Sequence, residues 1–388
     1  MNKITITVLL FFTTFLGNAV VFGQNSELRS IQTVVPFLTI APDSRAGGMG
    51  DAGVATSPDV YSMHWNPAKF AFIDGKGGVG LSYSPWLRNL VPDINIAYLA
   101  GYKRLDSKQV LATSLLYSSL GDVSFTDDYG NLERVFNPNE FALDAAYSRL
   151  FNENLSGGIA FRFIYSNLTG GVYSGGTATK AGTSFAADIS AYYKKDISVF
   201  SKDALLSFGL NFSNIGSKMS YSDSQKSDFI PMNMRLGTAE TIHLDSYNSL
   251  TLTVDLNKLL VPTPPVYDSD STGLIISGKN PDVGVPVAIF QSFGDAPDGF
   301  SEELHEITYS FGAEYWYNNQ FAIRGGYFHE NETKGNRKYF TAGAGFRLKV
   351  FTFDFSYLMP TVQNHPLART LRFSLSFDFN SLRNAGKS

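Results

Sequence analysis

Cysteine is absent from the 388 residues of this chain, which excludes disulfide bonds and thiolate metal sites. Charged residues are scarce as well, at 17%, and the formal net charge is only −4. Nucleic-acid binding needs clustered lysine and arginine, so this mild acidity argues against a nucleic-acid partner. The five histidines are far apart in the sequence, and no pair has the close helical spacing of a zinc site. We therefore expect no metal, no cofactor and no catalytic constellation.

Long apolar runs are also missing once the first residues are set aside. Residues 1–23 carry Lys3, then an apolar stretch from Ile4 to Leu16, and are typical of a cleaved signal peptide. Beyond them no run of about 18 apolar residues remains, so we expect no helical membrane span. Aromatic residues nevertheless make up 14% of the chain, and there are 35 glycines. Apolarity spread over alternate positions is typical of an exported β-barrel of the outer membrane.

Alternation of apolar and polar residues is the main pattern in the rest of the chain. In Leu371 to Phe379 every odd position is apolar and every even position is polar or charged, as on a strand with one apolar and one wet face. Similar segments recur and predict about fourteen strands. The expected strands are Gly78 to Trp86, Ile94 to Lys103, Val110 to Ser118, Phe141 to Leu150, Leu155 to Ser166, Ser184 to Lys194, Leu205 to Asn214, Met232 to Ile242, Leu250 to Leu259, Ile307 to Tyr317, Phe321 to His329, Lys338 to Leu348, Val350 to Leu358 and Leu371 to Phe379.

Nine charged residues inside these segments fall on the polar side of the alternation. A charge there would be costly if it faced hydrocarbon, but a wet lumen would accept it. Both signs occur, so we expect these side chains to pair across the interior. The residues are Arg162, Asp188, Arg235, Asp255, Glu314, Arg324, Arg347, Asp354 and Arg372.

The lengths of the links separate a barrel from a soluble β-sandwich, which alternation alone would also allow. Links after even-numbered strands are short, as at 104–109 and 318–320. Most links after odd-numbered strands are longer and polar, as at 119–140, 167–183 and 260–306. Short periplasmic turns and long outer loops are typical of an up-and-down barrel.

We therefore predict an all-β fold, a transmembrane antiparallel up-and-down β-barrel of about fourteen strands with an N-terminal hatch or plug in its lumen. The expected parts are a signal peptide (1–23), a periplasmic or hatch segment (24–77), the barrel (78–379) with its long outer loop (260–306), and a C-terminal tail (380–388).

A glycine-rich segment precedes the first expected strand. Gly48-x-Gly50-x-x-Gly53 matches the string of the dinucleotide-binding fingerprint, but that fingerprint lies between a strand and a helix of a βαβ unit, and no such alternation is present. The glycines instead indicate a compact segment that bends tightly and packs in a narrow space.

The residues of this segment carry a family resemblance. Ala46 to Ala55, followed by Asn66-Pro67-Ala68, resembles the N-terminal hatch of the fourteen-stranded FadL-like (OMPP1/FadL/TodX) outer-membrane barrels. The longer string Met63 to Phe70 resembles more specifically the PorV family of the type IX secretion system. On this resemblance the hatch motif consists of Gly48, Gly50, Asp51, Gly53, His64, Trp65, Asn66, Pro67 and Ala68.

The resemblance implies a non-enzymatic outer-membrane subunit of a protein secretion machine. Its expected partners are the type IX translocon barrel, the C-terminal signal domains of secreted cargo, the sortase-like attachment complex at the cell surface, and outer-membrane lipid. The alternative is a FadL-like transporter of long-chain hydrophobic compounds, in which the hatch shifts to open a route. This alternative predicts a continuous apolar pocket beneath the outer loops.

The longest expected loop, 260–306, is rich in proline and contains four aromatic residues of interest. At this length a neutral connector is unusual, although a disordered loop stays open as an alternative. Large aromatic side chains commonly anchor protein interfaces. We expect the partner-binding aromatics of this loop to be Tyr267, Phe290, Phe293 and Phe300.

Overall fold

The computed structural model describes residues 28–88, 91, 93–127, 129–171, 173–174, 177–223, 226–268, 273–362 and 365–379. The expected signal peptide and the expected C-terminal tail lie outside these residues.

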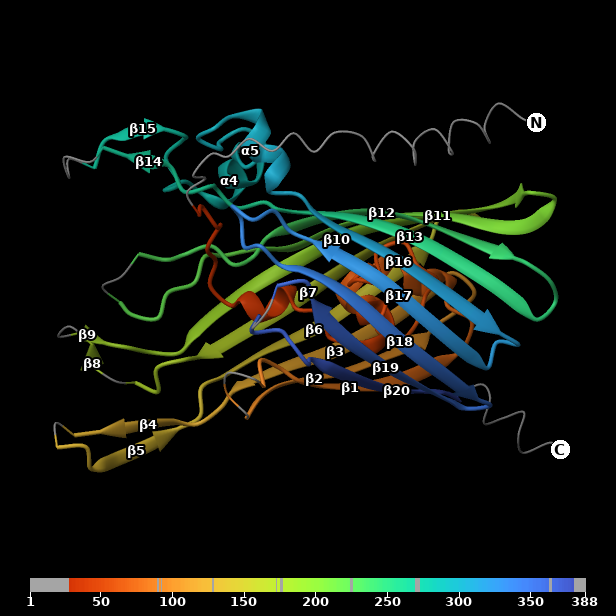
Figure 1. The fold of residues 1–388 in the computed structure, drawn as a ribbon, viewed down its shortest axis with the longest axis horizontal. Coiled ribbons are helices and arrows are strands. Elements are labelled where there is room, and N and C mark those ends of the chain that lie inside the picture. The colour runs from red at the N-terminus through yellow and green to blue at the C-terminus, as the bar shows by residue number, and fades with distance from the viewer. Residues whose placement is uncertain are drawn as a thin grey trace.

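Fourteen antiparallel strands close into one barrel, in which the first strand pairs with the last (Figure 1). The closing register sets Gly78 opposite Asp378 and Leu81 opposite Leu375. The predicted fold class and all fourteen predicted strands are confirmed, with small differences at strand ends. The barrel strands are β1 (Gly77–Pro85), β2 (Ile94–Arg104), β3 (Gln109–Leu120), β6 (Asn139–Leu150), β7 (Leu155–Asn167), β10 (Gly182–Val199), β11 (Lys202–Gly216), β12 (Asn233–His243), β13 (Asn248–Leu259), β16 (Thr308–Tyr317), β17 (Phe321–His329), β18 (Lys338–Leu348), β19 (Phe351–Pro360) and β20 (Leu371–Asp378).

The alternation along the strands sorts side chains between the outside and the lumen. On β7, Phe161 is 65% exposed whereas its neighbour Arg162 is buried. On β13, Leu252 is exposed and Thr251, Thr253 and Asp255 are buried. Because successive side chains on a strand point to opposite faces, the exposed apolar set is the lipid-facing surface and the buried polar set faces the lumen.

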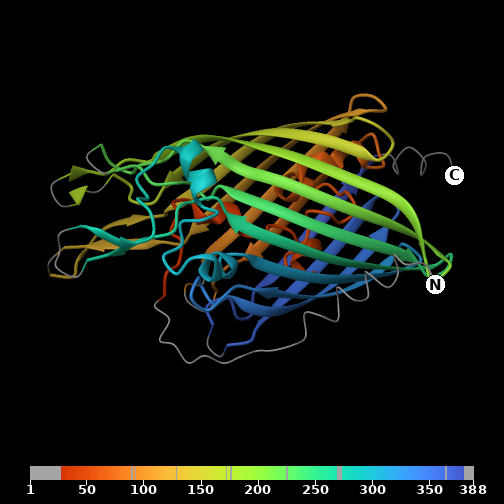
Figure 2. The ribbon, with the colours of Figure 1, turned by 90° about the horizontal axis from the view of Figure 1, so that it is seen from above.

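The two ends of the barrel differ as the link lengths predict. The β2–β3, β10–β11 and β16–β17 links are short turns at one end, and the long links gather at the other end (Figure 2). Three long links contain two-stranded hairpins: β4 (Val123–Thr126) with β5 (Leu132–Phe136), β8 (Tyr173–Ser174) with β9 (Thr177–Ala178), and β14 (Val266–Tyr267) with β15 (Ile275–Ser277). We refer to the long-link end as the outer end.

The long loop between β13 and β16 is folded, which argues against the disordered alternative for its described part. Besides β14 and β15 it contains the helices α4 (Val285–Gln291) and α5 (Phe300–His305). Ala288 of α4 is fully buried, and its neighbour Ile289 packs against the hydrophobic cluster that includes Leu260 and Val261. No helix among the described residues is long and apolar enough to cross a membrane.

The segment before β1 lies inside the barrel, where Figures 1 and 2 show it as the red and orange chain between the strands. It contains the short helices η2 (Pro36–Thr39), α2 (Ser44–Gly47), α3 (Ser62–Trp65) and η3 (Pro67–Phe72). Many of its side chains are fully buried, including Met63 and Phe70. The predicted plug of the lumen is therefore present, and we call residues 41–73 the hatch.

The beginning of this segment lies at the outer end of the barrel, within the expected periplasmic or hatch segment (24–77). Arg29 N–H donates to the Thr333 carbonyl in the β17–β18 loop, and Val34 N–H donates to the Phe229 carbonyl in the β11–β12 loop. From there the chain runs down the lumen and enters β1 at the short-turn end. Sequence patterns missed this because the segment lacks a periodicity of its own.

Candidate functional site

Asn66-Pro67-Ala68 is the point at which the hatch is attached to the barrel wall. The Asn66 side-chain oxygen accepts a hydrogen bond from Ala68 N–H at 3.0 Å and so caps η3. Its amide nitrogen donates to the carbonyls of Val54 in the hatch and Ala191 in β10, at 3.1 and 3.0 Å. One buried side chain therefore joins two parts of the hatch to the wall.

Serines of three neighbouring strands complete this attachment. Ser148 of β6 donates to the Pro67 carbonyl at 2.6 Å, and Ser156 of β7 donates to the Ala68 carbonyl at 2.7 Å. Ala68 N–H donates to Ser190 Oγ of β10 at 3.0 Å. All three serines are buried, so the lumen-facing hydroxyls satisfy backbone groups that water cannot reach.

The glycines of the hatch motif lie where its backbone touches the opposite wall. Gly50 has a φ of 68°, and a Cβ there would come within 2.7 Å of the Tyr327 backbone nitrogen and oxygen. Thr341 of β18 accepts from Gly50 N–H at 2.8 Å and donates to the Gly48 carbonyl at 3.0 Å. Gly53 N–H donates to the Asp255 carboxylate at 2.7 Å. Gly48 and Gly50 thus pack against the backbone of the wall, and Gly53 packs against the Trp65 ring, which agrees with the predicted narrow space rather than with a nucleotide site.

The other motif residues hold charged side chains of the wall. Asp51 accepts from Tyr339 Oη at 2.6 Å and pairs with Arg372 at 3.0 Å. The Trp65 indole N–H donates to Asp43 at 2.6 Å, and the Arg235 guanidinium lies 4.8 Å from the Trp65 ring centroid. The same guanidinium donates to the His64 carbonyl at 3.2 Å. The structure therefore brings all nine motif residues together in one interface between hatch and wall.

Sequence reasoning missed three further charged residues of this interface, Asp43, Arg45 and Lys69. Arg45 pairs with Glu314 of β16 at 2.8 Å and with Asp59 of the hatch at 2.9 Å. Lys69 is buried and donates to the Gly53 carbonyl at 2.8 Å. Their charge within a segment of mostly small and apolar residues could have identified them, because a charged side chain is buried only with a partner.

Burial shifts the titration of two of these hatch groups. Burial, reinforced by the nearby Asp59 carboxylate, raises the pKa of Asp43 to about 6. Burial lowers the pKa of Lys69 to about 8, although the Asp59 carboxylate opposes that shift. Both directions follow from the cost of holding a charge away from water.

Some of the charged residues of the wall pair with each other, as predicted from their shared side of the alternation, whereas Arg372, Arg235 and Asp255 contact the hatch. Arg324 pairs with Glu314 and with Asp354, each at 2.7 Å. Arg162 pairs with Asp144 at 2.6 Å and with Asp188 at 3.3 Å. Three of these pairs link adjacent strands, and the Arg324–Asp354 pair joins β17 to β19 across β18, so the lumen around the hatch is polar.

The four aromatic residues predicted for partner binding do not form one surface. Tyr267 lies on β14 and lines a pocket at the outer end, together with prolines of the long loop. Phe293 and Phe300 line a different recess against the outside of β12 and β13. Phe290 is 81% exposed on α4. Any partner role for this loop is therefore divided between two faces.

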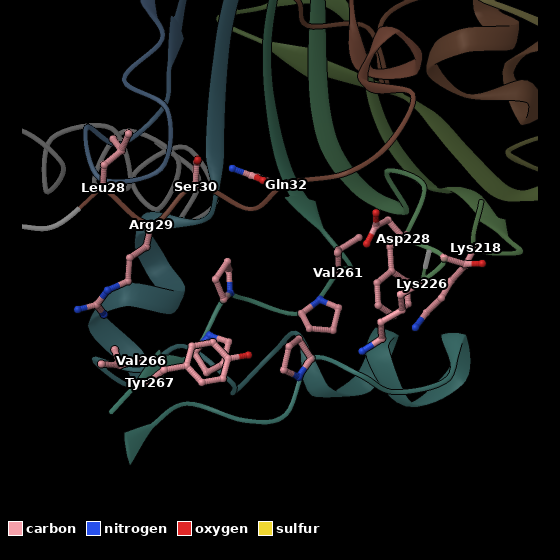
Figure 3. A pocket seen from close by; sticks show the side chains of 16 residues that line it. Leu28, Arg29, Ser30, Gln32, Lys218, Lys226, Asp228, Val261, Val266 and Tyr267 are labelled. Carbon is pink, nitrogen blue, oxygen red and sulfur yellow. The ribbon is translucent and has the colours of Figure 1, made fainter. Parts of the chain in front are cut away.

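The pocket that contains Tyr267 has a volume of about 700 Å³ and lies between the N-terminal segment and the long loop (Figure 3). Lys218, Lys226 and Asp228 lie on one side of it and Arg29 on the other. Lys226 pairs with Asp282 at 2.7 Å. The pocket is open, and it is lined by prolines together with charged side chains.

A buried ionic cluster, which we call the clasp, fixes the long loop to the barrel. Lys258 of β13 pairs with Glu303 at 2.9 Å and with Glu306 at 2.6 Å. Lys334 of the β17–β18 loop pairs with Glu302 at 2.7 Å and with Glu306 at 3.0 Å. Because these side chains come from three separate segments, the clasp ties the outer end together.

A comparison with protein families decides which family this barrel represents. The profile described as Type IX secretion system protein PorV matches residues 23–266, more than half of the chain. This chain belongs to the PorV family. It is therefore an outer-membrane β-barrel of the type IX secretion system, and the resemblance drawn from the hatch residues is confirmed.

Two solved structures are similar to this chain over most of its length. The CymD monoaromatic hydrocarbon channel is 13% identical, with a TM-score of 0.50, over 87% of this chain and 97% of that one. The Pseudomonas putida toluene transporter TodX is 12% identical, with a TM-score of 0.49, over 90% and 98% of the two chains. At this identity the likeness to CymD shows the fold alone. No curated protein gives a significant match.

Proposed function

We propose that this PorV-family barrel is a non-enzymatic subunit that binds the type IX translocon, receives cargo through its C-terminal signal domain and delivers it to the attachment machinery at the cell surface. The family match to residues 23–266 carries the proposal, because it spans the hatch and the barrel through β13. The outer hairpins and the folded long loop supply the exposed surface that protein partners require.

The filled lumen supports a function exercised on the outside of the barrel. Arg45, Asp51 and Asp255 of the hatch and wall are engaged in buried polar contacts across the lumen. Breaking such contacts to open a path would leave buried charges without partners, at a cost of about 3–5 kcal/mol for each broken pair. A closed barrel that presents loops is the arrangement expected of a docking subunit.

Co-purification from native membranes tests this proposal. Tagged protein expressed at its natural level is extracted in mild detergent, captured, and analysed by mass spectrometry. We expect the translocon barrel and cargo that retains its C-terminal domain. A parallel capture with an unrelated tagged outer-membrane barrel gives the background. Recovery of the bait alone, at normal yield, would contradict the proposal.

The competing candidate is transport of long-chain hydrophobic compounds, which rests on the fold shared with CymD. That function needs a continuous apolar path past the hatch, whereas the hatch is surrounded by lumen charges such as Arg324 and Glu314. A deletion strain separates the two candidates. Normal secretion of surface proteins together with lost uptake of hydrophobic substrates would favour transport, and the reverse would favour secretion.

A further inference from the structure

Two neighbouring barrel strands differ from the rest in their aromatic content. β12 and β13 contain no Phe, Tyr or Trp, whereas every other barrel strand that the structure describes has at least one. Outer-membrane barrels carry girdles of aromatic residues where the wall meets the membrane interfaces. Towards the outer end of these two strands the outward positions are instead Met234, Leu236 and Leu256. β2 also lacks an outward aromatic residue, because Tyr98 and Tyr102 contact the hatch, but β12 and β13 together leave a two-strand gap in the outer girdle.

Aromatic residues of the long loop lie over this gap. Phe293 and Phe300, together with Leu304 of α5, enclose an apolar recess of about 180 Å³ against Leu236 and Leu256. Figure 1 shows α4 and α5 on the outside of the wall beside β12. The missing girdle residues are thus supplied by another part of the chain.

The clasp shows that the loop is built to stay on the outside of the wall. Asp255 points into the lumen, where it accepts from Gly53 N–H, so alternation turns Lys258 outward. A lysine facing lipid would be costly. Lys258 is nevertheless only 5% exposed, because Glu303 and Glu306 cover it and neutralise it. The Phe293 ring centroid is 5.9 Å from its ammonium group.

We propose that α4 and α5 form a membrane anchor at the outer interface and that the recess beneath α5 binds an acyl chain of the surrounding lipid. The recess is continuous with the lipid-facing wall, since Leu236 is 45% exposed on that surface. Phe290 and Phe300 are 81% and 77% exposed, which is unfavourable in water and favourable at a lipid interface. This anchor orients the outer loops at the membrane surface and does not depend on which partners bind there.

Tryptophan fluorescence in vesicles tests the anchor. The full-length barrel with Phe300→Trp is reconstituted without partners into phosphatidylcholine vesicles, with or without bromine on the acyl chains. Trp65 and Trp316 are buried and Trp86 is partly buried, so the parent protein gives the baseline emission that is subtracted. Tyr129→Trp is the matched control, because Tyr129 is 92% exposed beside the β4–β5 hairpin. Brominated lipid should quench most of the additional emission of the Phe300→Trp variant and little of that of the Tyr129→Trp variant. Aqueous iodide should quench Tyr129→Trp more than Phe300→Trp.

Lipid retention tests the recess itself. The parent protein and Leu304→Trp, whose indole fills the recess, are released from phosphatidylcholine vesicles and compared by native mass spectrometry. The parent protein should retain one phospholipid more than the variant. Val287→Trp on α4 is the control, because Val287 is 54% exposed and does not line the recess. Equal retention in the two variants would overturn the acyl-chain site. Iodide quenching of Phe300→Trp without quenching by brominated lipid would overturn the anchor and mark this face as a water-exposed protein-docking surface.

Discussion

At the scale of single residues, Asn66 contributes three side-chain hydrogen bonds to the attachment of the hatch. Its side chain caps η3 and reaches a hatch carbonyl and a wall carbonyl, all in a buried position. Pro67 begins η3 and offers its carbonyl to Ser148. The motif therefore combines a proline, whose fixed φ favours the start of a helix, with hydrogen bonds to the wall.

Replacing Asn66→Ala and Pro67→Gly together should loosen the hatch. The lost cap costs about 1 kcal/mol, and unsatisfied buried carbonyls cost ~1–3 kcal/mol. The expected result is increased entry of small antibiotics into cells, measured as a lower inhibitory concentration at matched surface expression. Asn131→Ala, in the exposed β4–β5 link, is the control. Unchanged permeability with a normally folded barrel would refute the proposed role of the motif.

Gly50 offers a sharper test, because this protein contains a glycine of similar backbone conformation without crowding. Gly50 has φ 68° and Gly130 has φ 84°, but only Gly50 faces wall backbone atoms within 3 Å of an added Cβ. Both alanine variants carry the left-handed strain of about 1–2 kcal/mol, and Gly50→Ala adds a clash with the strand backbone. We expect a much lower unfolding temperature for Gly50→Ala on semi-native gels. Equal effects in the two variants would show that the close contact is unimportant.

At the scale of elements, strands were predictable and the covering loop was not. Leu371 to Phe379 could be assigned because one face meets lipid and the other meets the lumen, and this difference leaves a period of two in the sequence. The helices α4 and α5 are too short for a clear period, and Lys258 breaks the outward apolar pattern of β13. Only the fold shows that carboxylates from α5 cover it. The glycines located the hatch motif in the sequence. Its ionic contacts could not be predicted, because their partners come from strands that meet the hatch only in the closed barrel.

Acid should release α5 from the clasp. Burial raises the pKa of Glu302, but the hydrogen bond and charge of Lys334 outweigh it and hold the pKa below the usual 4.5. A lowered native pKa contributes stability that is complete above the ordinary glutamate range and is lost as pH falls through the native value. Hydrogen exchange of α5, corrected for intrinsic rates, should stay constant from neutral pH down to that range and then increase. Glu302→Gln should exchange faster already at neutral pH. Protection that persists in acid while the barrel stays folded would contradict this assignment.

At the scale of the whole molecule, the barrel and the outer loop are separable in principle. The fourteen strands close through hydrogen bonds between neighbouring strands. The long loop only connects β13 to β16, which pair with each other directly. A short turn in place of residues 264–303 would therefore preserve the wall, but it would remove Glu303 and Phe293 from Lys258 and leave Glu306 as its partner on the lipid-facing side. The matching change Lys258→Met removes that charge, and we expect the combination to yield a barrel that is still heat-modifiable on gels.

Loss of the loop should affect partner capture rather than barrel formation. We expect the loop-shortened Lys258→Met barrel to recover less translocon and less cargo than the parent protein, because the β14–β15 hairpin of the loop supplies exposed apolar side chains at the outer end, away from the proposed membrane anchor. Lys258→Met alone, with the loop intact, is the control for the substitution. The readout is quantitative mass spectrometry of captured proteins at equal bait recovery. Undiminished capture would show that partners bind elsewhere on the barrel, and it would leave membrane anchoring as the remaining role of the loop.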